Sequence, residues 1–189
     1  LTYRGKRRMT TIVNAVGSGD LGVELDVAEV NSDLDLPYTE YNPSNYHGLY
    51  VRIVEEGPLI TIYRSGKYII SGCSSLEQLY ETNDAFLAKL SELNIVDMDA
   101  KTGLTVQNVV CTAQLGNKIN LNTLSIALGL ESVEYEPEQF PGLVYRLADY
   151  QAVLLIFTSG KTVITGSSKL DTAEGAFNHL QEQVVNYLR

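Results

Sequence analysis

The chain contains the same sequence unit twice. When the 189-residue sequence is shifted by 94 residues, positions 13–77 align with positions 107–171 without a gap, and 20 of these 65 positions are identical. The identities include whole motifs, since Ser65-Gly66-Lys67 returns as Ser159-Gly160-Lys161. A repeat of this length and regularity predicts two copies of one structural unit, related by pseudo-symmetry.

Each copy has the same expected order of elements: a strand, a short helix, several antiparallel strands and a long closing helix. Expected strands cover residues 12–16, 49–54, 59–63 and 68–71, and then 104–111, 143–147, 153–157 and 162–165. The expected short helices cover residues 25–34 and 121–128, with Asn120 or Asn122 suited to cap the second one. The Ser-Gly-Lys motifs are typical of hairpin turns. The expected fold class is therefore α+β.

The closing helices are predicted from apolar residues spaced three and four apart, which lie on one helical face. These residues are Leu76, Leu79, Phe86, Leu90 and Leu93, and in the second copy Leu170, Ala173, Phe177, Leu180, Val184 and Leu188. One such helix covers only one face of a sheet. The strands at 59–63 and 153–157 are apolar on both faces, so the second face is expected to be an exposed apolar binding surface.

The net charge of −9 argues against a nucleic-acid binder, because such proteins usually present a basic surface. The acidity lies mostly in residues 1–100, which carry 8 Lys and Arg against 15 Asp and Glu, whereas residues 101–189 carry 6 against 8. The one dense basic run, Arg4–Arg8, falls in a predicted N-terminal tail of residues 1–9. This tail is either a solvated extension or an arm that binds phosphates.

Several classes of function find no support in the sequence. His47 and His179 lie on different expected elements, without a nearby nucleophile motif, so no catalytic residue is assigned. The Ser-Gly-Lys turns lack the spacing of a phosphate-binding loop. Cys73 and Cys111 are expected to be small buried residues in a reducing compartment, and no metal or cofactor is expected. No membrane-length apolar run is present, and an intracellular location is expected.

Three motifs of the second copy, residues 106–110, 134–146 and 154–161, resemble the TATA-box-binding proteins, and the archaeal form is the nearer match. The acidic composition is consistent with a haloarchaeal member. The resemblance covers residues 10–189 and implies two saddle repeats, at 10–100 and 101–189. It further implies a curved antiparallel sheet whose concave face lies in the DNA minor groove, with the helices on the convex face.

The resemblance assigns a set of DNA-binding residues. Central polar positions fall on Asn14, Ser71, Asn108 and Thr165, next to an apolar floor of Val16, Ile69, Val110 and Val163, with Gln107 beside them. Phosphate contacts fall on Arg52, Lys67, Arg146 and Lys161, and the inserted aromatic positions on Tyr46, Tyr63, Phe140 and Phe157. Small donors above an apolar floor suit A·T pairs, whose minor-groove edges carry only acceptors.

The first copy departs from the family pattern. It has tyrosine at both inserted aromatic positions, Val13 where the second copy has Gln107, an acidic segment at 54–58, and no lysine in Cys73–Ser75. Fewer phosphate contacts predict weaker binding and a flatter salt dependence at this end of the site.

The resemblance also implies partners. Glu136, Glu138 and Gln139 occupy positions that help to receive transcription factor B, which brings RNA polymerase to the promoter. A solvated acidic loop is the alternative for these residues. The alternative for the whole chain is a diverged saddle paralogue that regulates transcription by binding proteins, with weak or relaxed DNA binding. Self-association through the apolar face in the absence of DNA is left open.

Overall fold

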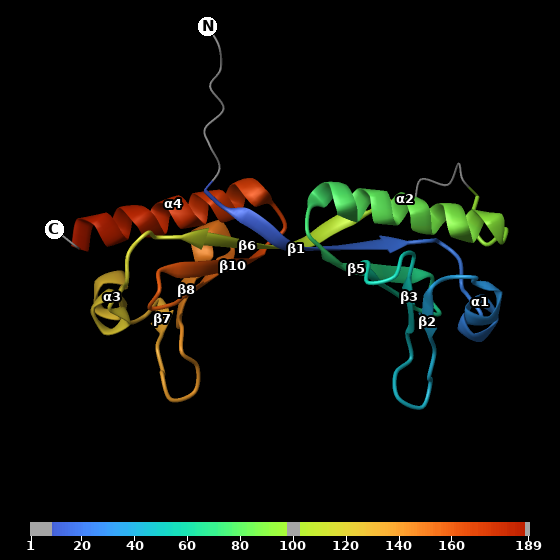
Figure 1. Ribbon diagram of the computed structural model, residues 1–189, viewed down its shortest axis with the longest axis horizontal. Helices are drawn as coiled ribbons and strands as arrows, with labels where there is room; N and C mark the ends of the chain where they lie inside the picture. The colour runs from blue at the N-terminus through green and yellow to red at the C-terminus, as the bar shows by residue number, and fades with distance from the viewer. Residues whose placement is uncertain (1–8, 98–102, 188–189) are drawn as a thin grey trace, which may run out of the picture. The chain divides into compact units, whose positions relative to one another are not determined.

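The computed structural model describes residues 9–97 and 103–187, so the basic run Arg4–Arg8 and Leu188 lie outside the described residues. The described chain forms two compact units, shown in Figure 1. The first unit consists of residues 14–97 and 103–107, and the second consists of residues 9–13 and 108–187. The predicted α+β class with two repeats is confirmed, because each unit combines one antiparallel sheet with two α-helices.

The two units have matching elements. Those of the first are β1 (Thr11–Asp20, from Asn14 on), α1 (Val27–Asp33), β2 (Tyr38–Glu40), β3 (Leu49–Arg52), β4 (Leu59–Ile62), β5 (Lys67–Cys73) and α2 (Leu76–Glu92). Those of the second are β6 (Thr105–Gln114, from Asn108 on), α3 (Leu121–Leu128), β7 (Val133–Glu134), β8 (Leu143–Leu147), the 3-10 turn η1 (Ala148–Tyr150), β9 (Ala152–Ile156), β10 (Lys161–Ser167) and α4 (Leu170–Tyr187). Their strand orders are β2-β3-β4-β5-β1 and β6-β10-β9-β8-β7.

The predicted hairpin turns are confirmed in both units. Gly66 and Gly160 have φ values of +81° and +83°, which glycine adopts without strain. Their carbonyl groups accept hydrogen bonds of 3.0 Å from the backbone N–H groups of Leu21 and Leu115. A side chain at Gly66 would also meet the Val23 carbonyl oxygen at 2.1 Å. These glycines therefore tie the β4–β5 and β9–β10 hairpins to the chain that follows β1 and β6.

Both short helices begin at a side-chain cap. The Asp26 carboxylate accepts from the backbone N–H groups of Ala28 and Glu29 at 3.1 Å. Asn120 accepts from Thr123 in the same way at 3.1 Å, as predicted for α3. Such caps satisfy N–H groups that the first turn of a helix leaves unpaired. Helix α1 is shorter than the predicted 25–34, because this cap sets its first residue at Val27.

In each unit the long helix packs on one face of the sheet (Figure 1). In α2 the side chains of Leu79, Phe86 and Leu90 are fully buried, as the apolar spacing predicts. In α4 the buried set includes Phe177 and Leu180. Burial alternates along the first part of β5 and β10, where Tyr68, Ile70, Thr162 and Ile164 are buried and the residues between them are partly or fully exposed; the alternation then shifts by one residue at Gly72 and Gly166. Each sheet therefore has one covered and one uncovered face.

The covered face of the first unit is built around Tyr68. This residue is fully buried, its hydroxyl donates to Asn83 Oδ1 at 2.7 Å, and its ring lies edge-on to Phe86 at 5.0 Å. Gly19 stands opposite Tyr68 on β1, and a side chain there would come within 2.3 Å of the ring. A large polar ring on β5 thus requires a glycine on β1 and an amide on α2.

The second unit fills the same space in another way. The position equivalent to Tyr68 is Thr162, which is fully buried and stands opposite Ala113. The position equivalent to Asn83 is Phe177, also fully buried. Thr162 is smaller than Tyr68. Its cross-strand neighbour Ala113 is larger than Gly19, and Phe177 on the helix is larger than Asn83. Close packing in protein interiors accounts for this compensation, because voids and clashes both destabilise.

Some predicted element bounds are wrong. The strand expected at 49–54 ends at Arg52, because residues 53–56 form a turn in which Glu56 has a φ of +59°. The short edge strands β2 and β7 were not predicted, since two or three residues carry no readable alternation. None of the helices within the described residues has the length and apolar character that a membrane span requires.

Candidate nucleic-acid interface

The uncovered sheet faces carry the strand residues that the resemblance assigned to DNA, with the exception of Gln107, described below. In the first unit these are Asn14, Val16, Arg52, Lys67, Ile69 and Ser71; in the second they are Asn108, Val110, Arg146, Lys161, Val163 and Thr165. All are partly or fully exposed. Cross-strand pairing aligns Ile69 with Ser18 and Thr61, and Val163 with Thr112 and Leu155. Each uncovered face therefore combines exposed apolar residues, such as Ile69 and Val163, with polar side chains.

The two central asparagines occupy equivalent positions at β-bulges. The register of β1 and β5 shifts between Ala15 and Gly17, and Asn14 Oδ1 accepts from the Gly72 N–H at 2.9 Å. In the second unit Asn108 Oδ1 accepts from the Gly166 N–H at 3.1 Å. A bulge leaves a ladder group unpaired, and the amide oxygen supplies the missing acceptor. This fixes the orientation of each amide, with Nδ2 as its donor end.

The aromatic pairs also occupy equivalent positions. Phe140 and Phe157 meet edge-on, with ring centroids 5.9 Å apart and planes at 66°. Tyr46 and Tyr63 meet at 6.3 Å and 70°. The first ring of each pair lies in the loop before β3 or β8, and the second follows β4 or β9. Edge-on contact is a favourable arrangement of two aromatic rings, so both pairs are preformed.

A glycine makes room for each aromatic pair. A side chain at Gly48 would come within 2.7 Å of the Tyr46 ring, and one at Gly142 within 2.7 Å of the Phe140 ring. The two glycines are also related by the 94-residue offset of the repeat. The close approach of ring and backbone explains why both copies have glycine here.

The first unit adds two rings and two hydroxyl groups to its pair. Tyr46 stacks on Tyr50 at 5.3 Å, and His47 contacts the rings of Tyr46 and Tyr63 at 4.7 and 5.4 Å. The Tyr46 and Tyr63 hydroxyl oxygens are 2.8 Å apart and share a hydrogen bond. Partial burial, and then the bond to Tyr46, raise the pKa of Tyr63 to about 12. We call these four residues the tyrosine cluster.

Both arginines are engaged within their own unit. Arg52 Nη1 donates to the Gly57 carbonyl oxygen, and its guanidinium lies 5.8 Å from the centre of the Tyr38 ring. Arg146 forms an exposed ion pair with Glu134 at 3.3 Å. Sequence reasoning missed these contacts, because β2 and β7, which supply Tyr38 and Glu134, were not predicted. Exposed ion pairs contribute little stability, so Arg146 can exchange its partner at little cost.

The other assigned residues are exposed. Lys67 and Lys161 begin β5 and β10 directly after the hairpin turns. Gln107 belongs to the first unit, where its amide donates to Ser18 Oγ at 2.8 Å. Glu136, Glu138 and Gln139 lie in the loop between β7 and β8, and all three are exposed. In Figure 1 this loop extends from the sheet on the side away from α4.

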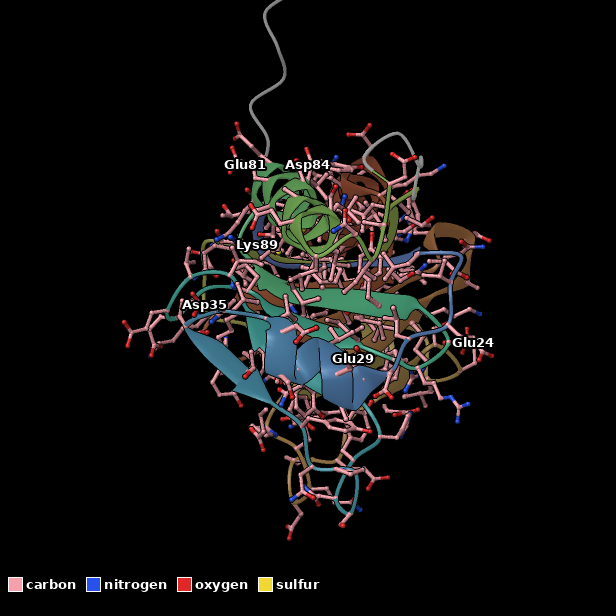
Figure 2. The ribbon with its side chains drawn as sticks, turned by 90° about the vertical axis from the view of Figure 1, so that its right-hand side faces the viewer. Glu24, Glu29, Asp35, Glu81, Asp84 and Lys89 are labelled. Atoms are coloured by element: carbon pink, nitrogen blue, oxygen red, sulfur yellow. The ribbon has the colours of Figure 1, made fainter. Side chains whose placement is uncertain are left out.

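Much of the acidity of the first unit lies away from its uncovered sheet face, and the exceptions are Asp20 and Glu40, which stand opposite Lys67 and Tyr50 in the strand register. Figure 2 shows acidic side chains of α1, α2 and the neighbouring loops pointing into solvent, among them Glu24, Glu29, Asp35, Glu81 and Asp84. Helix α2 covers the opposite face of the sheet. A negative net charge is therefore compatible with a sheet face that carries Arg52 and Lys67.

The two cysteines and the two histidines, all within the described residues, do not come together in a metal site. Cys73 and Cys111 are buried, as predicted, and burial raises the pKa of the Cys73 thiol. His47 belongs to the tyrosine cluster, whereas His179 lies near Tyr145 and Tyr150 in the second unit. Among the described residues, no cluster of His, Cys, Asp and Glu has the composition of a metal site.

Comparison with known proteins identifies the family. The model of the family described as transcription factor TFIID (or TATA-binding protein, TBP) matches residues 9–93 and 103–187, which are the two repeats. The chain belongs to the TATA-binding protein family. The TATA-binding protein relatives include TATA-box-binding protein C of Halobacterium salinarum, which is 61% identical over 92% of this chain and 96% of its own length. TATA-box-binding protein 2 of Haloferax volcanii is 45% identical over 92% and 91% of the two chains.

A solved structure of the same family has this fold. The TBP of Methanococcus jannaschii superposes with a TM-score of 0.81 and 38% identity, covering 94% of this chain and 98% of that one. The predicted resemblance to archaeal, and specifically haloarchaeal, TATA-binding proteins is confirmed.

Proposed function

We propose that the chain binds A/T-rich promoter DNA through its two uncovered sheet faces, inserts aromatic side chains from the minor groove to kink the duplex, and recruits transcription factor B and RNA polymerase. Its family membership supports a role in transcription. The observation that carries the finer proposal is a preformed aromatic pair and a fixed asparagine amide in each unit, which lie toward opposite ends of β5 in the first unit and of β10 in the second.

The chemistry of the faces suits the minor groove of A·T pairs. These pairs present only acceptors there, and the Nδ2 groups of Asn14 and Asn108 are donors. Val16, Ile69, Val110 and Val163 provide no partner for the amine of a G·C pair. The rings of Phe140 and Phe157 are partly exposed and can stack on an opened base step.

The loop residues Glu136, Glu138 and Gln139 would contact transcription factor B. They are exposed, and the turn that carries them is held by hydrogen bonds from the Gln139 and Phe140 N–H groups to the Glu136 carbonyl oxygen. A basic surface on the partner would complement the two carboxylates.

A gel-shift titration with an A/T-rich promoter duplex at several salt concentrations tests the DNA part. We expect specific binding with a shallow salt dependence, because Arg52, Lys67, Arg146 and Lys161 are the cations of the two faces. About four phosphate contacts limit the logarithmic slope to about −4. A steeper slope would show that other basic groups dominate, and no binding at any salt concentration would overturn the proposal.

Transcription factor B is then added to the same assay. We expect E136R/E138R to abolish the ternary complex while DNA binding persists. The matched control is E77R/E81R, the same charge reversal on the exposed side of α2, which should leave the ternary complex intact. A ternary complex that survives E136R/E138R would refute the loop assignment. Binding of factor B without any DNA binding would instead support the protein-binding paralogue.

A further inference from the structure

The loop before β3 carries a residue whose charge depends on pH. His47 follows Tyr46 in this loop and is exposed. Histidine is the side chain whose ordinary pKa places its change of charge between about pH 5 and 8. The equivalent residue of the second unit, 94 positions further along the chain, is Pro141, which has no charge at any pH. The first unit therefore has a titratable group beside its aromatic pair where the second unit has none.

Two tyrosine rings hold the His47 imidazole in place. Its centre lies 4.7 Å from that of the Tyr46 ring and 5.4 Å from that of the Tyr63 ring, with interplanar angles of 43° and 35°. Tyr46 is itself stacked on Tyr50 at 5.3 Å. These contacts are compatible with a protonated imidazole, because a cation within about 6 Å of an aromatic ring is attracted to the face of that ring. His47 is therefore positioned before any ligand binds.

His47 borders an open hollow of about 690 Å³ in the first unit. Ile69, which belongs to the uncovered sheet face, lines the same hollow together with Lys67 and Tyr63. The hollow is therefore continuous with the surface proposed to bind DNA. His47 and Lys67 lie around one opening on that surface.

The fixed charges of the hollow partly cancel. Besides His47, the charged side chains that line it are Asp20, Arg64 and Lys67. Asp20 stands opposite Lys67 in the strand register. Arg64 also borders a second hollow, whose lining includes the carboxylates of Glu24 and Asp26. Because carboxylates offset both cations, the proton on His47 determines how strongly the hollow attracts an anion.

The other titratable groups packed against His47 are tyrosine hydroxyls. The hydroxyl oxygens of Tyr46 and Tyr63 are 2.8 Å apart and share a hydrogen bond. Partial burial, and then this bond, raise the pKa of Tyr63 to about 12, so its hydroxyl is neutral over the range in which histidine changes its charge. Of the Tyr63 and His47 side chains, only His47 therefore changes its charge near neutral pH.

We propose that protonated His47 binds a DNA phosphate together with Lys67, so that the first unit gains a phosphate contact as the pH falls and the second unit does not. This inference rests on the proposed binding of DNA through the uncovered faces. A protonated imidazole has two N–H donors, and a hydrogen bond between a cation and a phosphate is stronger than one between neutral groups. DNA binding is then coupled to the uptake of a proton, and the affinity falls as the pH rises.

The experiment measures fluorescence anisotropy of the full chain with a labelled A/T-rich duplex at about pH 5.5 and about pH 8, each at several salt concentrations. At low salt we expect wild type to bind about three- to tenfold more tightly at the lower pH. The logarithmic salt slope should also be steeper there by about 0.9, because one further phosphate contact releases further counterions. A role of His47 in ring packing alone would not change this slope with pH.

Three variants assign the pH dependence to His47. H47Q keeps a polar side chain without a titratable group, and its salt slope should be the same at both pH values. Carboxylates begin to take up protons near the lower pH, so the readout is the pH effect of wild type divided by that of H47Q. H47R carries a permanent charge and should have the steeper slope at both pH values. H179Q is the matched control, because His179 lies on α4 of the second unit near Tyr145, and it should keep the wild-type pH effect.

The outcomes separate the two proposals. If wild type binds the duplex but H47Q keeps the full pH effect, the His47 inference is wrong and the proposed function stands. A wild-type salt slope that is the same at both pH values also overturns the inference, and so does a pH effect that is lost in H179Q. Failure of wild type to bind the duplex at either pH overturns both proposals.

Discussion

The first and second units show how one backbone supports two chemistries. Both sheets have an asparagine at a bulge, a glycine beneath an edge-on aromatic pair, and a Ser-Gly-Lys turn at the same offset. The second unit presents Phe140 and Phe157 at its wedge, and the first presents a hydrogen-bonded tyrosine pair within a cluster of four rings. These scaffold residues are shared, and the first difference between the units lies in aromatic groups on the uncovered face.

A second difference lies inside the two cores. Tyr68 with Gly19 in the first unit corresponds to Thr162 with Ala113 in the second, and both strand residues, Tyr68 and Thr162, are fully buried. The repeats therefore share a fold but differ in their core residues. Replacing one core residue of the first unit by its counterpart should destabilise the protein, whereas replacing the three interacting residues together should restore much of the stability.

The largest expected effect is that of Y68T. The substitution leaves a cavity beside Phe86 and removes the partner of Asn83, so the free energy of unfolding should fall by about 3–5 kcal/mol. The triple variant G19A/Y68T/N83F installs the set of the second unit and should regain more than half of that loss. Denaturant unfolding of both variants measures this. A triple variant less stable than Y68T would contradict the equivalence of the two cores.

G19A alone should destabilise by about 1–3 kcal/mol, because its methyl group would stand 2.3 Å from the buried Tyr68 ring. The reciprocal change, A113G, should cost only about 1 kcal/mol, from the greater freedom of glycine in a strand. Thermal unfolding of G19A and A113G measures the loss of stability in each variant. Equal losses would show that Tyr68 yields to the added methyl group.

N14A and N108A should each cost about 0.5–1.5 kcal/mol, because water can reach the backbone N–H that either change releases. N108A should cost the larger amount, since Asn108 Nδ2 also donates to Thr165 Oγ1 at 3.2 Å. Unfolding curves of the single variants test the order. A change above about 3 kcal/mol would mean that the bulge itself collapses.

The smallest expected effect is the pH dependence of the stability that Tyr63 contributes. The folded-state pKa of Tyr63 is raised to about 12 from an ordinary value of 10.0, so the folded state holds this proton more tightly. Its contribution to stability is complete below pH 10 and is lost as the pH rises through 12. Y46F should lower the pKa of Tyr63 without restoring 10.0, because burial is the larger cause. Spectroscopic titration of the tyrosines checks both statements, and a Tyr63 pKa near 10 in wild type would contradict them.

Much of the fold could be predicted because the sequence contains the same unit twice. The hairpin glycines, the Asn120 cap and the apolar face of α2 and α4 each leave a local signal of spacing or turn chemistry. The short edge strands β2 and β7 left none. They pair with β3 and β8, so only the three-dimensional structure shows them.

The candidate site was predicted as a set of residues and not as a set of contacts. Resemblance to a family gave positions such as Tyr46 and Tyr63, which are 17 residues apart in the sequence. Their shared hydrogen bond depends on how the loop before β3 meets the end of β4, and no sequence pattern encodes that meeting. The contacts of Arg52 with Gly57 and Tyr38 escaped prediction for the same reason.

The proposed function requires the uncovered faces to read A·T pairs from the minor groove. The most direct measurement compares the affinity of the chain for an A/T-rich duplex and for the same duplex with every A·T pair replaced by inosine·cytosine. This exchange alters the major-groove edges and leaves only acceptors in the minor groove. We expect Kd values for the two duplexes within about threefold of each other. A loss of about tenfold or more on the inosine duplex would show that the chain reads the DNA elsewhere.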